Sequence, residues 1–324
     1  MRICFVVHRY APYPGGSEVY VRNLAEESLR RGHETWVLTD VHKGDLDGVR
    51  VTSDDAVLDS GFDLIVVHGG NMGAQSRVLE RAGALRSPVL YMLVSHVDQG
   101  FVNAGMRDAA FLGWSTPADM ERIRSAGGEA RAVQVRHGIE LSGSTGKPGF
   151  REKFGIAPQR RMFLSCGGYW AHKRMKPLAR LFERLDTEAL LVTTGYHKPF
   201  WSMPRRSAKV LPLLLDDRAD VISAISEANC YIMHSEHEGF GLVLLEAMAN
   251  GTPWLSFDTG GASLMREYGE VYREDAELER LISQFSRDDA RVTRAREYVL
   301  ANHLVSHSVD DIEAVAALAK PAGN

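Results

Sequence analysis

The sequence predicts an α/β protein with two Rossmann-like, doubly wound domains facing a cleft. The first observation is alternation, because short continuous apolar runs, typical of buried parallel strands, are separated by helical patterns along the chain. The second is length, since 324 residues at about 150 per domain suggest two domains. The third is a break at Leu141–Gly149, whose Ser, Gly and Pro residues are typical of a linker. We therefore expect one domain over residues 1–143 and another over 150–305.

The N-terminal half begins with a strand followed by a helix. Ile3–Val7 is apolar and β-rich, and Val21–Leu29 repeats apolar residues at helical spacing. Ser17 is the expected cap of this helix and Gly32 its expected stop. Further apolar runs predict strands at 35–38, 64–67, 89–94, 111–114 and 132–135, with helices near 73–84 and 117–126.

The alternation resumes after the linker. Apolar runs predict strands at 162–166, 190–193, 209–211, 230–233 and 253–257. The stretch from Ala276 to Leu318 predicts helix, with a break near Ser306.

Composition limits the classes of function. The 38 basic and 42 acidic residues give a net charge of −4, which argues against a nucleic-acid binder. Cys4, Cys166 and Cys230 lack the close pairing of a zinc site and are expected to be buried thiols. Leu64–Ser76 lacks charged residues but is too short and polar to span a membrane.

We therefore expect a cytosolic protein. Contact with the inner membrane surface stays open, because Trp201, Met203, Arg205 and Arg206 mix basic and apolar character. The oligomeric state is not indicated.

The first candidate binding turn is Gly15-Gly16, just before the first predicted helix. Glycines there let the backbone approach a ligand, and free N–H groups favour an anion. A tight loop with a serine cap explains the same residues equally well.

The second turn joins Gly167-Gly168 to a basic cluster, Lys173, Arg174 and Lys176, ahead of a helix in which Pro177 is the expected first residue. Cations at a helix N-terminus oppose the helix dipole, and a bound phosphate would remove the conflict. The alternative is a solvated charged loop.

The third turn is the most informative. Glu238 precedes Gly239-Phe240-Gly241, and the helix that follows is apolar on nearly every side, with Gly251 as its expected stop. Glu246 in the middle of this helix needs a partner, either a pair of ligand hydroxyls or an arginine from elsewhere.

Three candidate histidines lie at or near the ends of predicted strands. His96 follows the strand at 89–94, where it is placed to meet a phosphate or sugar hydroxyl. His234 and His237 form a His-x-x-His with no third ligand nearby, so we expect no metal site.

Together these turns resemble the retaining, nucleotide-sugar-dependent glycosyltransferases of family 4, which have the GT-B fold. Gly15-Gly16-Ser17-Glu18 is similar to the family's glycine loop, and Arg31-Gly32-His33-Glu34 to the segment ending its first helix. Ser235–Glu246 resembles its Glu-x7-Glu motif, and Asp258-Thr259-Gly260-Gly261 follows at the expected place.

The resemblance implies a role for each matching residue. Glu238 would hold the sugar hydroxyls of the donor, with His96 near that sugar, and Glu246 the ribose. Lys173, with Arg174, would bind the diphosphate, helped by backbone groups of Gly15, Gly16 and the turn Gly239, Phe240, Gly241, Leu242 and Val243. The helix near 306–319 would cross back onto the first domain. No cofactor or metal is implied beyond the nucleotide-sugar co-substrate, and the acceptor would be a glycan, a lipid-linked glycan or a small molecule.

One departure leaves alternatives open. The family usually has an arginine five residues before the phosphate lysine, and here that position is Gly168. The alternatives are another nucleotide-sugar enzyme of the same fold, such as an epimerase, and a degenerate binding protein without catalysis.

Overall fold

The computed structural model describes residues 1–42, 44–46, 48–70, 72–94, 105–196 and 202–319. The chain divides into two compact units. The N-terminal unit holds Met1–Gly138 together with His303–Asn324, and the C-terminal unit holds Ile139–Asn302.

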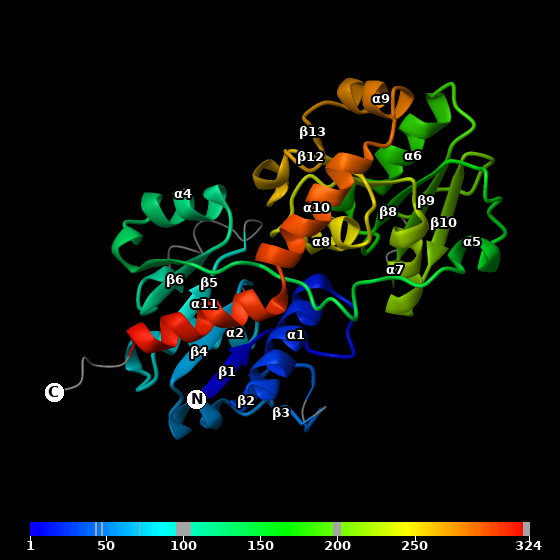
Figure 1. Cartoon of the computed structure of the whole chain (residues 1–324). Coiled ribbons are helices and arrows are strands. Elements are labelled where there is room, and N and C mark those ends of the chain that lie inside the picture. The colour runs from blue at the N-terminus through cyan, green and yellow to red at the C-terminus, as the bar shows by residue number, and fades with distance from the viewer. Residues whose placement is uncertain (43, 47, 71, 95–104, 197–201, 320–324) are drawn as a thin grey trace. The chain divides into compact units, whose positions relative to one another are not determined.

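The described part of the N-terminal unit is built on a seven-stranded parallel sheet in the order β3-β2-β1-β4-β5-β6-β7 (Figure 1). The continuous apolar runs form its centre, where β4 is buried at every position. The strands are β1 Arg2–Val6, β2 Glu34–Leu38, β3 Arg50–Thr52, β4 Leu64–His68, β5 Val89–Met92, β6 Phe111–Trp114 and β7 Ala132–Gln134. Its helices are α1 Gly16–Arg30, α2 Ala74–Arg81, α4 Pro117–Ser125 and α11 Val305–Leu318, with short 3₁₀ turns at Asp55–Ser60, Ala82–Ala84 and Glu129–Arg131.

Over residues 139–196 and 202–302, the C-terminal unit has a six-stranded parallel sheet in the order β10-β9-β8-β11-β12-β13. Its strands are β8 Met162–Cys166, β9 Leu190–Gly195, β10 Val210–Leu214, β11 Cys230–Met233, β12 Trp254–Phe257 and β13 Glu270–Tyr272. Its helices are α5 Phe150–Lys153, α6 Met175–Arg184, α7 Arg218–Glu227, α8 Leu242–Ala249, α9 Asp275–Ser283 and α10 Asp289–Asn302, with 3₁₀ turns at Ala171–Lys173 and Ala262–Met265.

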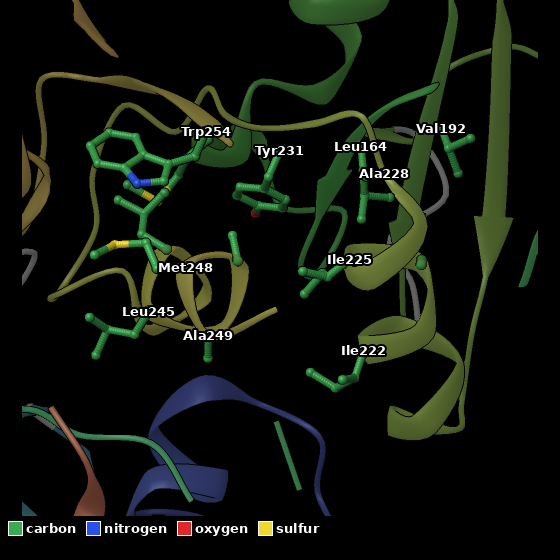
Figure 2. Close-up of a cluster of buried hydrophobic side chains, with 14 of the residues drawn as sticks. Leu164, Val192, Ile222, Ile225, Ala228, Tyr231, Leu245, Met248, Ala249 and Trp254 are labelled. Carbon is green, nitrogen blue, oxygen red and sulfur yellow. The ribbon is translucent and has the colours of Figure 1, made fainter. Parts of the chain in front are cut away.

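Helix α8 lies in the core of the C-terminal unit. Figure 2 shows Leu245, Met248 and Ala249 of α8 in one cluster with Tyr231 and Trp254 of the sheet. The burial of α8 on most sides explains why its sequence is apolar nearly all round and carries no clean amphipathic stripe. The same burial makes Glu246, in the middle of this helix, the residue that most needs explaining.

Each sheet contains a point where the strand order reverses. In the N-terminal unit β1 lies between β2 and β4, and in the C-terminal unit β8 lies between β9 and β11. Loops that leave neighbouring strands in opposite directions open a crevice at the carboxyl ends, which is where ligands bind in such folds. In the C-terminal unit the loops after β8 and β11 therefore form the expected ligand-binding edge of the sheet.

The segment Arg31–Glu34 holds the last helix on the N-terminal unit. Arg31 Nη1 lies 3.0 Å and His33 Nε2 2.6 Å from the Glu313 carboxylate of α11. Arg136 lies 2.7 Å from Asp311 on the same helix. These contacts attach α11 to the N-terminal unit, to which the chain returns at His303.

Several local predictions were wrong. Helix α1 begins at Gly16 with Gly15 as its N-cap, so Ser17 lies inside the helix and does not cap it. The Glu18 side chain folds back over Gly15, leaving no room there for even a methyl group. The helical stretch from 276 is interrupted twice, after Ser283 and after Asn302. The short strands β3 and β13 were missed.

The expected thiol burial is confirmed for Cys4 and Cys230, whereas Cys166 is partly exposed. Among the described residues, no helix has both the length and the apolar character that crossing a membrane requires.

Candidate functional site

Two charged side chains meet at the strand-order reversal of the C-terminal unit. Lys173 ends the 3₁₀ turn after β8, and Glu238 lies in the loop after the neighbouring strand β11. Lys173 Nζ lies 2.6 Å from Glu238 Oε1, and the two side chains are only 20% and 12% exposed. The structure therefore brings together two of the residues that the sequence marked separately.

The charge of Glu238 is maintained by its neighbours. Burial alone raises the pKa of this carboxyl, but Lys173, a hydrogen bond from Ser235 and nearby His172 outweigh burial, and the net pKa is lowered. Glu238 is therefore an ionised carboxylate at neutral pH.

The Glu238 loop is fixed by the glycine turn after β12. The backbone N–H of Gly261 donates to the Phe240 carbonyl at 2.7 Å, and Thr259 Oγ1 accepts from the Glu238 N–H at 3.2 Å. Gly260 has φ +57°, and a Cβ there would lie 2.8 Å from the Phe240 oxygen. Only glycine lets these two loops approach so closely, which explains why glycines occupy positions 260 and 261.

Helix α8 starts directly after this loop. Gly241 is its N-cap in the left-handed region at φ +89°, so Leu242 and Val243 present their N–H groups in the first turn. Gly251, at φ +68°, is the first left-handed residue past the helix, as the sequence predicted. The N-terminus of α8 thus lies only a few residues from Glu238.

Glu246 has an arginine partner. Its carboxylate is ion-paired with Arg218, at the start of α7, and its side chain is 9% exposed against 38% for Arg218. The arginine that the sequence left open as an alternative is therefore present. Arg218 is a site residue that the sequence analysis missed, because no local pattern links residues 28 positions apart.

Arg174 is engaged elsewhere in this structure. It adopts a left-handed backbone at φ +51°, its guanidinium lies 3.3 Å from Asp275, and it stacks over Phe257 at 5.4 Å. To reach a phosphate it would have to leave both partners. Pro177 is the third residue of α6 and not the first, because the helix already begins at Met175.

His234 follows β11 directly and is buried. Its Nδ1 lies 2.9 Å from the Tyr272 hydroxyl, and its Nε2 lies 3.6 Å from Asp275. Burial, reinforced by the charge of Arg174, lowers its pKa from 6.5 to about 4. This histidine is consequently neutral at pH 7.

Acidification is expected to destabilise the protein through His234. The unfolded chain takes up the proton first, because its histidine pKa is higher, so stability is full above pH 6.5 and is lost as pH falls toward 4. The contribution is on the order of 3 kcal/mol. Thermal melting from pH 7.5 to 4.5 should show a shallower decline in His234→Gln than in the wild type. His237→Gln, a solvent-exposed neighbour, is the control, and equal slopes in all three proteins would contradict the assignment.

The remaining predicted residues are distributed as follows. Gly15 and Gly16 lie at the start of α1 in the N-terminal unit. They follow β1, the strand at which the strand order of that sheet reverses. His96 and Trp201 lie outside the described residues. Within the described ranges, no group of three or more His, Cys, Asp or Glu side chains is placed to hold a metal ion.

Known proteins share this architecture over nearly the whole chain. HepE from Anabaena, solved in complex with UDP-glucose, aligns with a TM-score of 0.80 at 18% identity, covering 98% of this chain and 100% of that one. Sucrose-phosphate synthase from Thermosynechococcus elongatus aligns with a TM-score of 0.78 at 17% identity, covering 98% of each chain.

Sequence comparison adds matches within the chain. Residues 147–299 match the family model "Glycosyl transferases group 1". N-acetyl-alpha-D-glucosaminyl L-malate synthase from Bacillus anthracis is 26% identical over 130 residues, which cover 37% of this chain and 33% of that protein. The match spans about a third of this relative's length.

The chain has two α/β units, each built on a parallel sheet whose strand order reverses once, and it has the GT-B fold. The match to the glycosyl transferases group 1 model lies within its C-terminal unit.

Proposed function

We propose that the chain is a retaining glycosyltransferase that moves a sugar from a nucleoside diphosphate sugar to an acceptor hydroxyl. The observation that carries the proposal is the Lys173–Glu238 pair at the reversal point of the C-terminal sheet, with Glu246 eight residues further on. A cation for the diphosphate, a carboxylate for the sugar and a carboxylate for the ribose follow one another along the two neighbouring loops and α8.

The roles follow from position. Lys173 and the N–H groups at the start of α8 would bind the diphosphate, because both supply positive charge where a helix begins. Glu238 would accept hydrogen bonds from the sugar, and Glu246 from the two ribose hydroxyls. Binding would require each carboxylate to share or exchange its present cation with the ligand.

The reaction replaces one bond by another on the same face of the sugar. The bond between the anomeric carbon and the phosphate oxygen breaks, and the acceptor oxygen bonds to that carbon. The leaving diphosphate takes the proton of the acceptor hydroxyl, so the products are the glycoside and the nucleoside diphosphate. Lys173 would stabilise the charge that develops on the leaving oxygen.

The experiment is a thermal-shift panel with the UDP, GDP, ADP and dTDP esters of glucose. A ligand that binds only the folded state at 100 times its Kd stabilises it by about 2.7 kcal/mol, which raises the melting temperature by several degrees. We expect one nucleotide to do so, and the Anabaena complex with UDP-glucose makes UDP the first candidate. No shift with any of the four would count against the proposal.

Transfer is expected to be independent of divalent metal, because Lys173 and helix N-termini supply the positive charge that a metal would otherwise bring. Turnover should therefore survive excess chelator. Loss of turnover in chelator, restored by Mg²⁺ or Mn²⁺, would show that the protein charges are not sufficient.

A non-catalytic binding protein is the second candidate, favoured by the absence of a cationic side chain at Gly168. Slow hydrolysis of the donor in the absence of acceptor distinguishes the two candidates. A non-catalytic binding protein would be stabilised by a nucleotide sugar in the thermal-shift panel but would release no sugar from it.

A further inference from the structure

Gly167 and Gly168, which follow β8, are each covered by a side chain of the same loop. A Cβ built on Gly167 would lie 3.5 Å from Lys173 Cε and 3.9 Å from its Nζ. A Cβ built on Gly168 would lie 2.4 Å from Nε1 of Trp170. The Lys173 side chain thus passes over Gly167, and the N–H edge of the Trp170 indole lies over Gly168. A side chain at position 168 would therefore need the indole to move.

Hydrogen bonds hold the backbone of this loop on both sides of Trp170. Tyr169 is buried, and its hydroxyl lies 2.9 Å from the Thr193 carbonyl and 3.0 Å from the Leu213 carbonyl. The backbone N–H of Trp170 donates to the Gly168 carbonyl at 2.7 Å, and the Trp170 carbonyl accepts from the backbone N–H of Lys173 at 3.1 Å. These bonds hold the backbone of Trp170, a residue that is 40% exposed.

Trp170 is partly exposed, and its indole nitrogen lies over Gly168. Among the residues that the structure describes, none accepts a hydrogen bond from Nε1. The ammonium of Lys173 lies over the adjoining glycine. Two hydrogen-bond donors over neighbouring glycines, in a loop at the reversal point of the sheet, suit an anion with several oxygens.

We propose that Trp170 is a donor-binding residue whose indole N–H donates to the diphosphate beside Lys173. This inference rests on the proposed function and adds to it a residue that has no charge. In this chain the neutral indole N–H would then contribute to binding of the diphosphate. Glycine would be required at position 168, because the indole lies against it.

The test is calorimetric titration of the full chain. The two ligands are the nucleoside diphosphate of the glucose ester that binds in the thermal-shift panel and the corresponding nucleoside. Trp170→Phe and Trp170→Ala should each weaken diphosphate binding about tenfold and leave the nucleoside unaffected. Gly168→Ala should have a similar effect by displacing the indole. The double variant Gly168→Ala/Trp170→Ala should bind no more weakly than Trp170→Ala.

Trp36→Phe is the matched control, because it removes an indole N–H that donates to Glu34 in the N-terminal unit, and it should not change binding. Unchanged affinity in Trp170→Phe, alongside a loss in Lys173→Ala, would overturn the inference and leave the proposed function standing. Additive losses in the double variant would overturn the role of Gly168. If no nucleotide sugar bound the wild type, the proposed function would fail, and the inference with it.

Discussion

Replacing Lys173 with alanine is expected to weaken binding of the nucleoside diphosphate by about 10- to 100-fold and to leave nucleoside binding nearly unchanged. A charge-assisted hydrogen bond to phosphate contributes on the order of 1.5–3 kcal/mol. The structure adds a second reason, because Glu238 would then be a largely buried carboxylate without its cation, facing the ligand's negative charge. Both effects act on the phosphates and neither acts on the base or the ribose.

Calorimetric titration with the nucleoside diphosphate and the nucleoside would measure this difference. Lys153→Ala is a matched control, since Lys153 also pairs with a carboxylate at 2.6 Å, on Asp220 in the same unit, but is 55% exposed. Equal losses for the two ligands in Lys173→Ala would place Lys173 away from the phosphates. A loss in Lys153→Ala of the same size would mean that general electrostatics, and not a contact, explains the effect.

The central strands could be predicted from sequence because buried parallel strands are apolar on both faces. The runs that became β4, β8 and β11 were identified within a residue or two. The strands that were missed are short and lie at the edges of their sheets: β3 is Arg-Val-Thr and β13 is Glu-Val-Tyr. Edge strands are half-solvated, so their sequences differ little from loops. Pro212 likewise concealed the second half of β10, which tolerates proline because it pairs on one side only.

The site was only partly accessible to sequence reasoning. Spacing along the chain marked Lys173, Glu238 and Glu246, because glycine turns and an isolated acid on an apolar helix are local signals. Their partners depend on how the chain folds. Nothing local links Arg218 to Glu246, or shows that the indole of Trp170 covers Gly168.

The two carboxylates are already paired with cations in a way that bears on ligand binding. A diphosphate arriving at Lys173 competes with Glu238 for the same ammonium. If the phosphate displaces Glu238 from the ammonium, the carboxylate gains capacity to accept hydrogen bonds from the sugar that the phosphate carries. Binding of the phosphate and recognition of the sugar would then be linked through one ion pair.

The two glutamates should accordingly have separable roles. Glu246→Gln is expected to weaken binding of the bare nucleoside diphosphate by about 1–3 kcal/mol, because charged hydrogen bonds to the ribose hydroxyls are lost. Glu238→Gln should not weaken that affinity and can raise it, because the ammonium of Lys173 loses its competitor. It should lower transfer on the order of 100-fold, since a misplaced sugar loses its reactive geometry. Titration of both variants beside a transfer assay measures the difference.

The ion pair with Arg218 supplies the control for Glu246. If Glu246 serves only to pair with Arg218, then Arg218→Gln and Glu246→Gln should lower the melting temperature alike, and neither should change nucleotide affinity once the protein is folded. If Glu246 binds the ribose, Glu246→Gln should lose more nucleotide affinity than Arg218→Gln, because only the glutamate is placed to accept hydrogen bonds from hydroxyls. Loss of nucleotide affinity in Glu238→Gln and not in Glu246→Gln would reverse the assignment. An absence of effect on binding and turnover in both would leave the glutamates as structural residues and remove the main support for glycosyl transfer.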